Sequence, residues 1–310
     1  MSLTALFNMS FTAVELGLIC SLTVLSLFLS YSMLNVCDLS TDGCFTLGAA
    51  VGAIVALSGH PYLALPMAML AGSVSGFVTA FLQTRMGVNS LLAGIVVNTG
   101  LYSVNIAIMG GSSLLNMNKT ETVFVKMKNF LSTYGLAKYN VMFIGLIAVV
   151  IVLIFLSLFL KTKLGLAIRA TGNNPSMVKT SSINPVFTTT VGLCISNSFT
   201  ALSGCLLAQS QKSVSIDIGN GMVTVALASL LIGSTLVRRG SSAKKGVACV
   251  IGAIIFRITY MLALRLKMPA YMLKLVSSVI VVLAISLPYI KSKYPEFKRR
   301  MNHNKEIKNA

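Results

Sequence analysis

Uncharged stretches of twenty residues or more are the feature that most constrains how this chain can fold. They lie in six intervals between charged residues: Glu15 to Asp38, Asp42 to Arg85, Arg85 to Lys119, Lys138 to Lys161, Lys179 to Lys212 and Asp217 to Arg238. About 20 apolar residues, each rising 1.5 Å along a helix, cross a hydrocarbon core of about 30 Å. The chain is also 55% hydrophobic and 10% charged, with a mean hydropathy of +0.84. Such a composition predicts a membrane protein.

The fold class predicted from these stretches is an all-α, polytopic membrane protein with about nine transmembrane helices, within a range of eight to ten. The interval from Asp42 to Arg85 holds two helices, because Pro61 disfavours helix at His60. Two further segments contain one cation each, Arg257 near the middle and Lys274 near an end, and we expect both to span. The predicted helices lie near 9–34, 42–58, 61–84, 89–110, 139–160, 184–208, 220–237, 246–264 and 271–289.

Lys and Arg predict the orientation, because positive residues favour the cytoplasmic side of short loops. With the C-terminus inside, sixteen of them are cytoplasmic and seven are outside. This predicts a cytoplasmic stretch around 161–179, a basic cytoplasmic tail at 291–310 and, with nine spans, an outer N-terminus. The net charge of +18 is then explained by cations at helix ends and in the tail, where they meet anionic membrane lipid, and nucleic-acid binding is not expected.

The chain has few of the sequence motifs that are typical of catalytic or metal-binding sites. It contains no Gly-Lys pair and therefore no phosphate-binding P-loop, and its two histidines, His60 and His303, are too distant to form a metal site. The six cysteines lack metal-ligand spacing and are interpreted as free thiols. We expect no catalytic residue, metal or bound cofactor in this chain, and any ATP must be hydrolysed by another subunit.

The predicted cytoplasmic stretch reads TKLGLAIRATGNNPSMVKTSSINP, residues 162–185. Asn174 followed by Pro175 is typical of a helix N-cap with proline at the first helical position. Gly172 and Asn173 are expected to bend the chain before this cap, and Asn184-Pro185 to start the next spanning helix. This leaves room for a short helix near 174–182, suited to receiving a push from another protein; a simple connecting loop is the alternative.

The same stretch, the following SNSFTALSGCLLA (196–208) and VCDLSTDGCFTLGAAVGAIVAL (36–57) resemble permease subunits of ABC importers of the branched-chain amino acid and ribose class. The resemblance implies a type II ABC importer-like helical bundle over residues 1–290, in the bacterial cytoplasmic membrane. It also implies a permease homodimer with solute passing along its interface, cytoplasmic ATPase subunits that carry ATP and Mg²⁺, and an extracytoplasmic solute-binding protein. The residues that the resemblance assigns to coupling with the ATPase are Gly172, Asn173, Asn174, Pro175, Ser176, Met177, Val178 and Lys179.

Small and polar residues predict the packing and the solute path. Small-residue stripes, Cys44-Gly48-Gly52-Ala56 and Ala68-Gly72-Gly76-Ala80, predict close helix contacts. Asn98, Tyr102 and Asn105 share one helix face and are candidates to line the path, with interhelical hydrogen bonding as the alternative. Glu15 and Arg257 are further path candidates, which we expect to pair with each other or to face water. Asp38 and Asp42 are expected to flank a cytoplasmic turn after the first helix and to cap the second helix, with contact to the coupling region as the alternative.

A long outer connection, residues 111–138, carries Lys119, Lys126, Lys128 and Lys138 against the single acid Glu121. Within it, Val123, Met127 and Phe130 at helical spacing predict a short amphipathic helix. Under the importer interpretation, Lys126 and Lys128 help to dock an acidic surface of the solute-binding protein; a passive interfacial helix is the alternative.

The main rival function is an ion-coupled secondary transporter or a channel, in which Glu15 is the plausible proton carrier. A membrane enzyme is disfavoured because His, Asp and Cys are not clustered. The substrate favoured by the resemblance is a small polar organic solute, with amino acids ahead of sugars or nucleosides.

Overall fold

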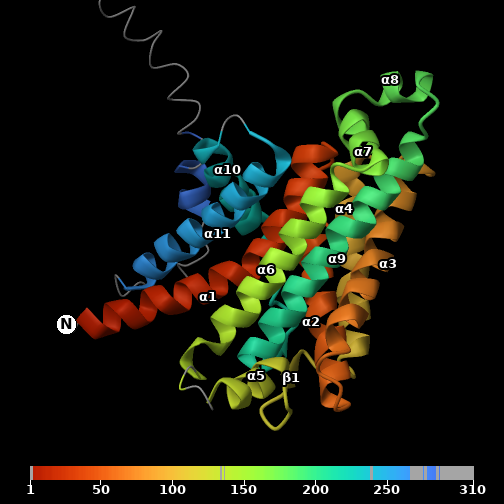
Figure 1. The fold of residues 1–310 in the computed structure, drawn as a ribbon. Helices are drawn as coiled ribbons and strands as arrows, with labels where there is room; N and C mark the ends of the chain where they lie inside the picture. The colour runs from red at the N-terminus through yellow and green to blue at the C-terminus, as the bar shows by residue number, and fades with distance from the viewer. Residues whose placement is uncertain are drawn as a thin grey trace, which may run out of the picture.

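A computed structural model describes residues 3–132, 135, 137–237, 240–265, 275, 278–283 and 286. It is an elongated bundle of helices, with α8 at one end and α5 at the other (Figure 1). Within these described residues, six helical segments are long and apolar enough to cross a membrane. They are α1 (Leu3–Leu27) with its π-helical continuation η1 (Phe28–Met33), α3 (Ala64–Thr84), α4 (Ser90–Ile108), α6 (Asn140–Phe159) after the 3₁₀ turn η2 (Ala137–Tyr139), α9 (Pro185–Gln211) and α11 (Ser242–Arg265).

Two further apolar helices are shorter, α2 (Thr41–Leu57) and α10 (Met222–Leu236). At 1.5 Å per residue they are about 26 and about 22 Å long, less than the hydrocarbon core. The remaining elements lie at the ends of the bundle: α5 (Val123–Ser132), α7 (Lys163–Asn173), α8 (Pro175–Thr180) and a two-stranded antiparallel pair, β1 (Leu114–Asn116) with β2 (Ser213–Ser215).

The helical, polytopic character predicted from the sequence is confirmed, but the count of nine spans is not. Eight of the predicted segments coincide with a helix to within a few residues, and two of these eight are the short helices α2 and α10. The ninth predicted segment, 271–289, lies largely outside the described residues, as does the predicted tail at 291–310.

Helix α9 lies in the interior, packed against α2, α3 and α1. The two small-residue stripes make this packing possible. A Cβ on Gly48 would overlap the backbone of Ala201, and one on Gly72 would lie 2.5 Å from the Asn197 carbonyl oxygen, both on α9. The predicted close helix contacts are therefore present, and their partner is the same helix for both stripes.

The two short helices begin inside the bundle. Asp38, three residues before α2, contacts Asn197, the thirteenth of the 27 residues of α9. The side chain of Asp42 contacts the start of α10. Both helices therefore begin near the middle of the bundle, and residues 34–40 return the chain to that depth after η1.

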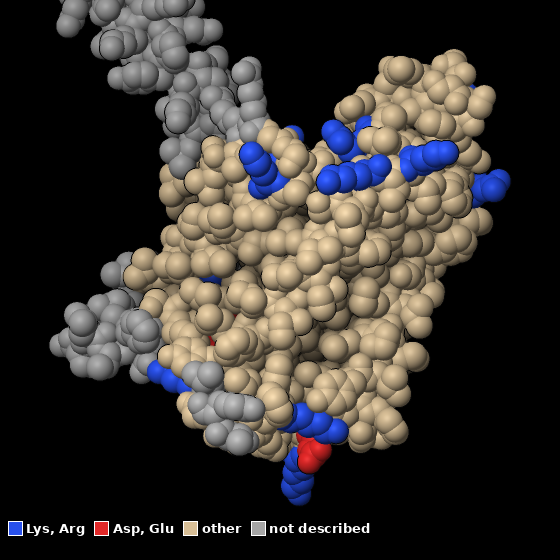
Figure 2. Space-filling model, in the orientation of Figure 1, with Lys and Arg blue, Asp and Glu red and all other residues tan. Residues whose placement is uncertain are grey.

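Charged side chains gather toward the two ends of the molecule (Figure 2). Lys and Arg mark the end that carries α7 and α8, and both signs of charge appear at the end that carries α5. The broad belt between them is almost free of charge on the face shown. This distribution is the one expected of helices that cross a bilayer.

Candidate functional site

The first candidate site is the projection formed by α7 and α8. Asn174 leaves the helical conformation, with φ −156° and ψ 94°. Its Oδ1 accepts hydrogen bonds from the Met177 amide at 3.1 Å and the Ser176 hydroxyl at 2.6 Å, and Pro175 occupies the first helical turn. The predicted N-cap and short helix are thus present, ending at Thr180 rather than at 182.

The predicted bend at Gly172 and Asn173 is wrong. Both residues belong to the last turn of α7, and the chain turns one residue later, at Asn174. The glycine has a packing role instead, because a Cβ at Gly172 would overlap the backbone of Met33 and Leu34. This close approach holds α7 against the end of η1.

Most of α8 faces outward. Met177 is 65% exposed, Ser176 and Lys179 are exposed, and Val178 alone among the helix's described side chains is buried. After α8, the Asn184 side chain accepts from the Val186 amide at 2.9 Å and so caps α9, as predicted. The projection is therefore tied to η1 at one side and to the interior helix α9 at the other.

The second candidate site is a polar junction in the middle of the bundle. The Asp42 carboxylate accepts hydrogen bonds from the amides of Gly221 and Val223, at 2.9 and 2.8 Å. These amides belong to the start of α10, which leaves such groups without intrahelical partners. Asp42 therefore sits in the first turn of α2 and caps α10.

Asp38 makes a second set of buried contacts beside this junction. One of its carboxylate oxygens accepts from the Ser40 amide and hydroxyl, at 2.8 and 2.6 Å, and the other accepts from Asn197 Nδ2 at 2.8 Å. The predicted cytoplasmic turn at Asp38 and Asp42 is wrong, because both acids lie at the depth of the centre of α9. The predicted capping role is right in kind, but Asp42 caps a helix nearly 180 residues away.

A polar cavity of about 250 Å³ opens beside this junction. The candidates Asn98, Tyr102 and Asn105 all line it from α4. Sequence reasoning missed the residues that face them: Asp42, Thr46 and Asn220. One sequence signal could have identified them. Polar residues precede α2 and α10, and each of these apolar helices is shorter than a membrane span.

Asn105 both lines the polar cavity and makes an interhelical hydrogen bond, the two alternatives that the sequence left open. Its Nδ2 donates to the Gly43 carbonyl of α2 at 3.1 Å, an interhelical hydrogen bond. Its Oδ1 is buried and has no hydrogen-bond partner within the described structure. Tyr102, by contrast, is 52% exposed. One face of α4 thus joins a packed contact to an open polar surface.

Arg257 and Glu15 do not line this cavity. Arg257 donates from Nη2 to Cys20 Sγ at 2.8 Å and lies over the Tyr260 ring, 5.9 Å from its centroid. It lines a separate pocket of about 670 Å³, which shares Asn220 with the polar cavity. Glu15 faces α6, near the Met142 backbone and Lys138. Of the two alternatives expected for them, pairing is not seen, because no ion pair joins Glu15 and Arg257 among the described residues; both side chains are partly exposed, and Arg257 lines a pocket.

The outer connection contains the predicted helix, α5, with a different buried face. Val123, Phe124 and Leu131 are buried, whereas Phe130, predicted on the apolar face, is 64% exposed. Lys128 is exposed. Lys126 is only partly exposed, lies over the Tyr62 ring and is 3.8 Å from Glu121 Oε2.

Known proteins resemble this chain over most of its length. A sequence model of the family described as "Branched-chain amino acid transport system / permease component" matches residues 9–285. A tyrosine transport system permease protein of Clostridioides difficile is 33% identical over 86% of this chain and 86% of its own.

More distant relatives include two other permeases. A probable branched-chain amino acid transport permease of Methanocaldococcus jannaschii is 27% identical over 78% of each chain. A galactose/methyl galactoside import permease of Haemophilus influenzae is 24% identical over 72% of this chain and 65% of its own. No solved structure matches. From the family match and the helical bundle together, the chain belongs to the family of permease components of branched-chain amino acid transport systems, and it is a multi-pass permease subunit of an ABC importer.

Proposed function

We propose that this permease carries a small polar organic solute, with an amino acid favoured, across the bacterial cytoplasmic membrane as part of an ATP-driven assembly. A separate pair of ATPase subunits binds ATP and Mg²⁺, and this chain binds no cofactor of its own. A solute-binding protein delivers the solute from the outside, and two copies of the permease enclose the path. The assignment of an amino acid is supported by the relatives named for tyrosine and branched-chain amino acids, which are more similar to this chain than the galactose permease.

The α7–α8 projection is the proposed contact with the ATPase. The observation that carries this proposal is the capped, outward-facing helix at Asn174–Thr180, bounded by packed helices on both sides. A rigid projection transmits a displacement, whereas a loose loop absorbs it. The coupling residues proposed are Gly172, Asn173, Asn174, Pro175, Ser176, Met177, Val178 and Lys179, with Gly172 and Asn173 acting through α7. This end, and with it the C-terminal tail, would face the cytoplasm.

The solute path is proposed to follow the open face of α4, past the polar cavity at the start of α2 and α10. Asn98, Tyr102 and Asn105 would offer amide and hydroxyl groups, and the polar lining of the cavity supports a site that exchanges hydrogen bonds with the solute. Asp42 would contribute its remaining lone pairs. Arg257 and Glu15 are weaker path candidates, because neither lines this cavity.

Docking of the solute-binding protein is proposed at the opposite end, on the connection 111–138. Lys126 and Lys128 would attract an acidic surface of that protein, and exposed Lys128 would carry most of the effect. Such steering weakens as salt rises, because the Debye length falls from about 10 Å at 0.1 M to about 3 Å at 1 M.

Reconstitution separates this function from the secondary transporter. The chain would be placed in liposomes alone, and then with its ATPase subunits and binding protein, and uptake of labelled leucine, tyrosine and galactose would be followed. We expect uptake only with the complete assembly, ATP and Mg²⁺, and none with a hydrolysis-deficient ATPase. Uptake by the permease alone, driven by an ion gradient, would overturn the proposal.

A further inference from the structure

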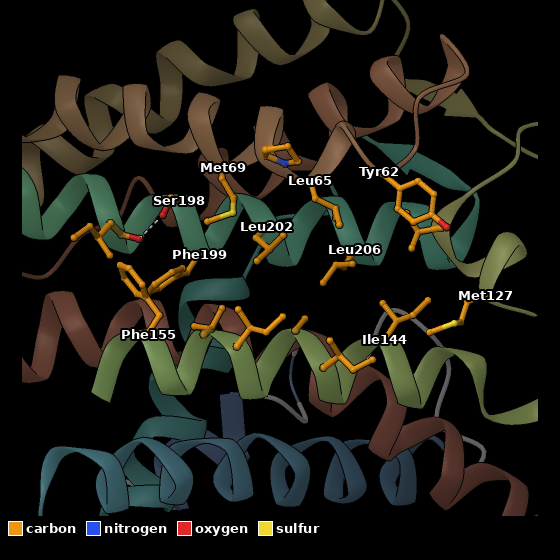
Figure 3. Close-up of a pocket in the computed structure, with 17 residues that line it drawn as sticks. Tyr62, Leu65, Met69, Met127, Ile144, Phe155, Ser198, Phe199, Leu202 and Leu206 are labelled. Carbon is orange, nitrogen blue, oxygen red and sulfur yellow. Dashed lines mark hydrogen bonds between the residues drawn. The ribbon is translucent and has the colours of Figure 1, made fainter. Parts of the chain in front are cut away.

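A long apolar groove lies between α3 and α6, with α9 as its floor, and no part of the function proposed above uses it. Its volume is about 540 Å³. Figure 3 shows its side chains following the helices from Phe155 and Phe199 at one end to Tyr62 and Met127 at the other. Helix α5 supplies Met127 and so borders the end near the charged connection.

The lining of the groove excludes a polar solute. Ser198 and Tyr62 are the members with polar side-chain atoms, and the Ser198 hydroxyl already donates to the Ile195 carbonyl at 2.7 Å. The other lining side chains are aliphatic, aromatic or thioether groups. An occupant therefore gains by burying hydrocarbon that is otherwise in contact with water.

The length of the groove matches one leaflet of a bilayer. On α6 the lining runs from Ile144 to Phe155, eleven residues apart, which is about 16 Å along a helix. Half of the hydrocarbon core is about 15 Å. The groove is open at the surface of the bundle, because Ile151 of α6, one of its lining residues, is 60% exposed.

The end bordered by α5 has the chemistry of a headgroup site. Lys126 Nζ lies 5.4 Å from the centroid of the Tyr62 ring, and Tyr62 is itself a groove residue that is 58% exposed. Tyrosine and lysine are typical of the membrane–water interface. Glu121 neutralises part of the Lys126 charge at 3.8 Å, but the connection 111–138 keeps an excess of positive charge.

From this combination we infer that the α3–α6 groove binds one acyl chain of an anionic phospholipid, whose phosphate lies at Lys126. The chain occupies the groove from Met127 to Phe155, and the headgroup remains at the outer end. This site does not depend on the identity of the transported solute. It makes a phospholipid a stoichiometric partner of the permease, in addition to the exchanging lipid around it.

Fluorescence quenching tests this site cleanly because the chain contains no tryptophan. Phe155→Trp places a single reporter in the groove, and Leu158→Trp places a control on the same helix, at a side chain that is 61% exposed and does not line the groove. Each purified variant would be titrated in detergent with brominated phosphatidylglycerol. We expect saturable quenching of the groove reporter at one lipid per chain, while the control follows the lipid fraction of the micelle.

Three outcomes overturn the site. Identical quenching curves at the two positions would mean that only bulk lipid is sensed. No quenching at Phe155→Trp would mean that protein, such as a second copy of the chain, fills the groove. Finally, Ala148→Phe would be added to Phe155→Trp to fill the groove. If this double variant elutes normally on size exclusion and the tryptophan is still quenched, the lipid binds elsewhere.

The headgroup contact has its own matched pair of variants. Lys126→Ala should weaken binding of brominated phosphatidylglycerol about fivefold, because a lysine near anionic lipid contributes about 1 kcal/mol. Lys128→Ala, which removes an exposed charge two residues away, should change it less than twofold. Equal effects of the two substitutions would rule out a phosphate bound at Lys126.

Discussion

The polar junction at the centre of the bundle and the α7–α8 projection at its end use the same chemistry for opposite purposes. In both, a carboxyl or amide oxygen caps the start of a helix. At the junction, Asp42 lies on one helix and caps another, so the bond holds two distant parts of the chain together. At the projection, Asn174 caps the helix that directly follows it, and the helix remains exposed.

This difference predicts different consequences of damage. Removing a contact at the junction, or in the small-residue packing around it, should destabilise the whole bundle. Removing the cap of α8 should leave the bundle intact and change only what the projection transmits. The four substitutions below test that contrast, in decreasing order of their expected effect on stability.

Gly72→Leu should have the largest effect. A leucine there would drive α3 away from α9, because even a Cβ would lie 2.5 Å from the Asn197 carbonyl and 2.6 Å from the Ala201 Cβ. Overpacking of this kind costs about 3 kcal/mol or more. We expect loss of the monodisperse peak on size exclusion in mild detergent. Gly100→Leu is the control, because nothing lies within 4 Å of a Cβ at Gly100; equal behaviour of the two variants would contradict the close packing.

Asn197→Leu should be next. The substitution removes the 2.8 Å hydrogen bond to Asp38 and leaves a buried acid with one partner fewer. Hydrogen bonds to charged groups contribute about 1.5–3 kcal/mol, so the thermal unfolding midpoint should fall by several degrees. Asn98→Leu makes the same chemical change at a partly exposed residue of α4 and should alter the midpoint little. A larger fall in the midpoint for Asn98→Leu than for Asn197→Leu would contradict the stabilising role of the Asp38–Asn197 hydrogen bond.

The sequence predicted the projection better than the junction, and the reason is the span of the contacts. The cap of α8 involves residues three apart, so Asn174-Pro175 is visible as a local pattern. The bonds of Asp42 and Asp38 join residues 179 and 159 apart, and no local pattern specifies their partners. Treating every apolar stretch as a full span then placed both acids in a cytoplasmic turn. The sequence showed the small-residue stripes, but it did not predict that both pack against the same helix, α9.

Asp42→Ala should have an intermediate effect concentrated at α10. Loss of an N-cap costs about 0.5–2 kcal/mol, and the charge favoured by the helix dipole is lost with it. Hydrogen exchange followed by mass spectrometry should show faster exchange in the first turn of α10, where the Gly221 and Val223 amides lose their acceptor. Asp217→Ala is the control, because Asp217 bonds the exposed Asn220 side chain. Unchanged protection of α10 in Asp42→Ala would refute the cap.

Asn174→Ala should have the smallest effect on stability and a specific effect on coupling. The cap contributes about 1 kcal/mol to a helix that can fray alone, so the unfolding midpoint should stay within one degree while amides of α8 lose protection. Under the proposed function, a frayed α8 transmits less of the ATPase movement, and ATP-driven uptake should fall several-fold with ATP hydrolysis retained. Asn174→Ser keeps a capping oxygen and should restore uptake. Wild-type uptake in Asn174→Ala, with α8 measurably frayed, would show that transmission does not require a rigid helix at this position.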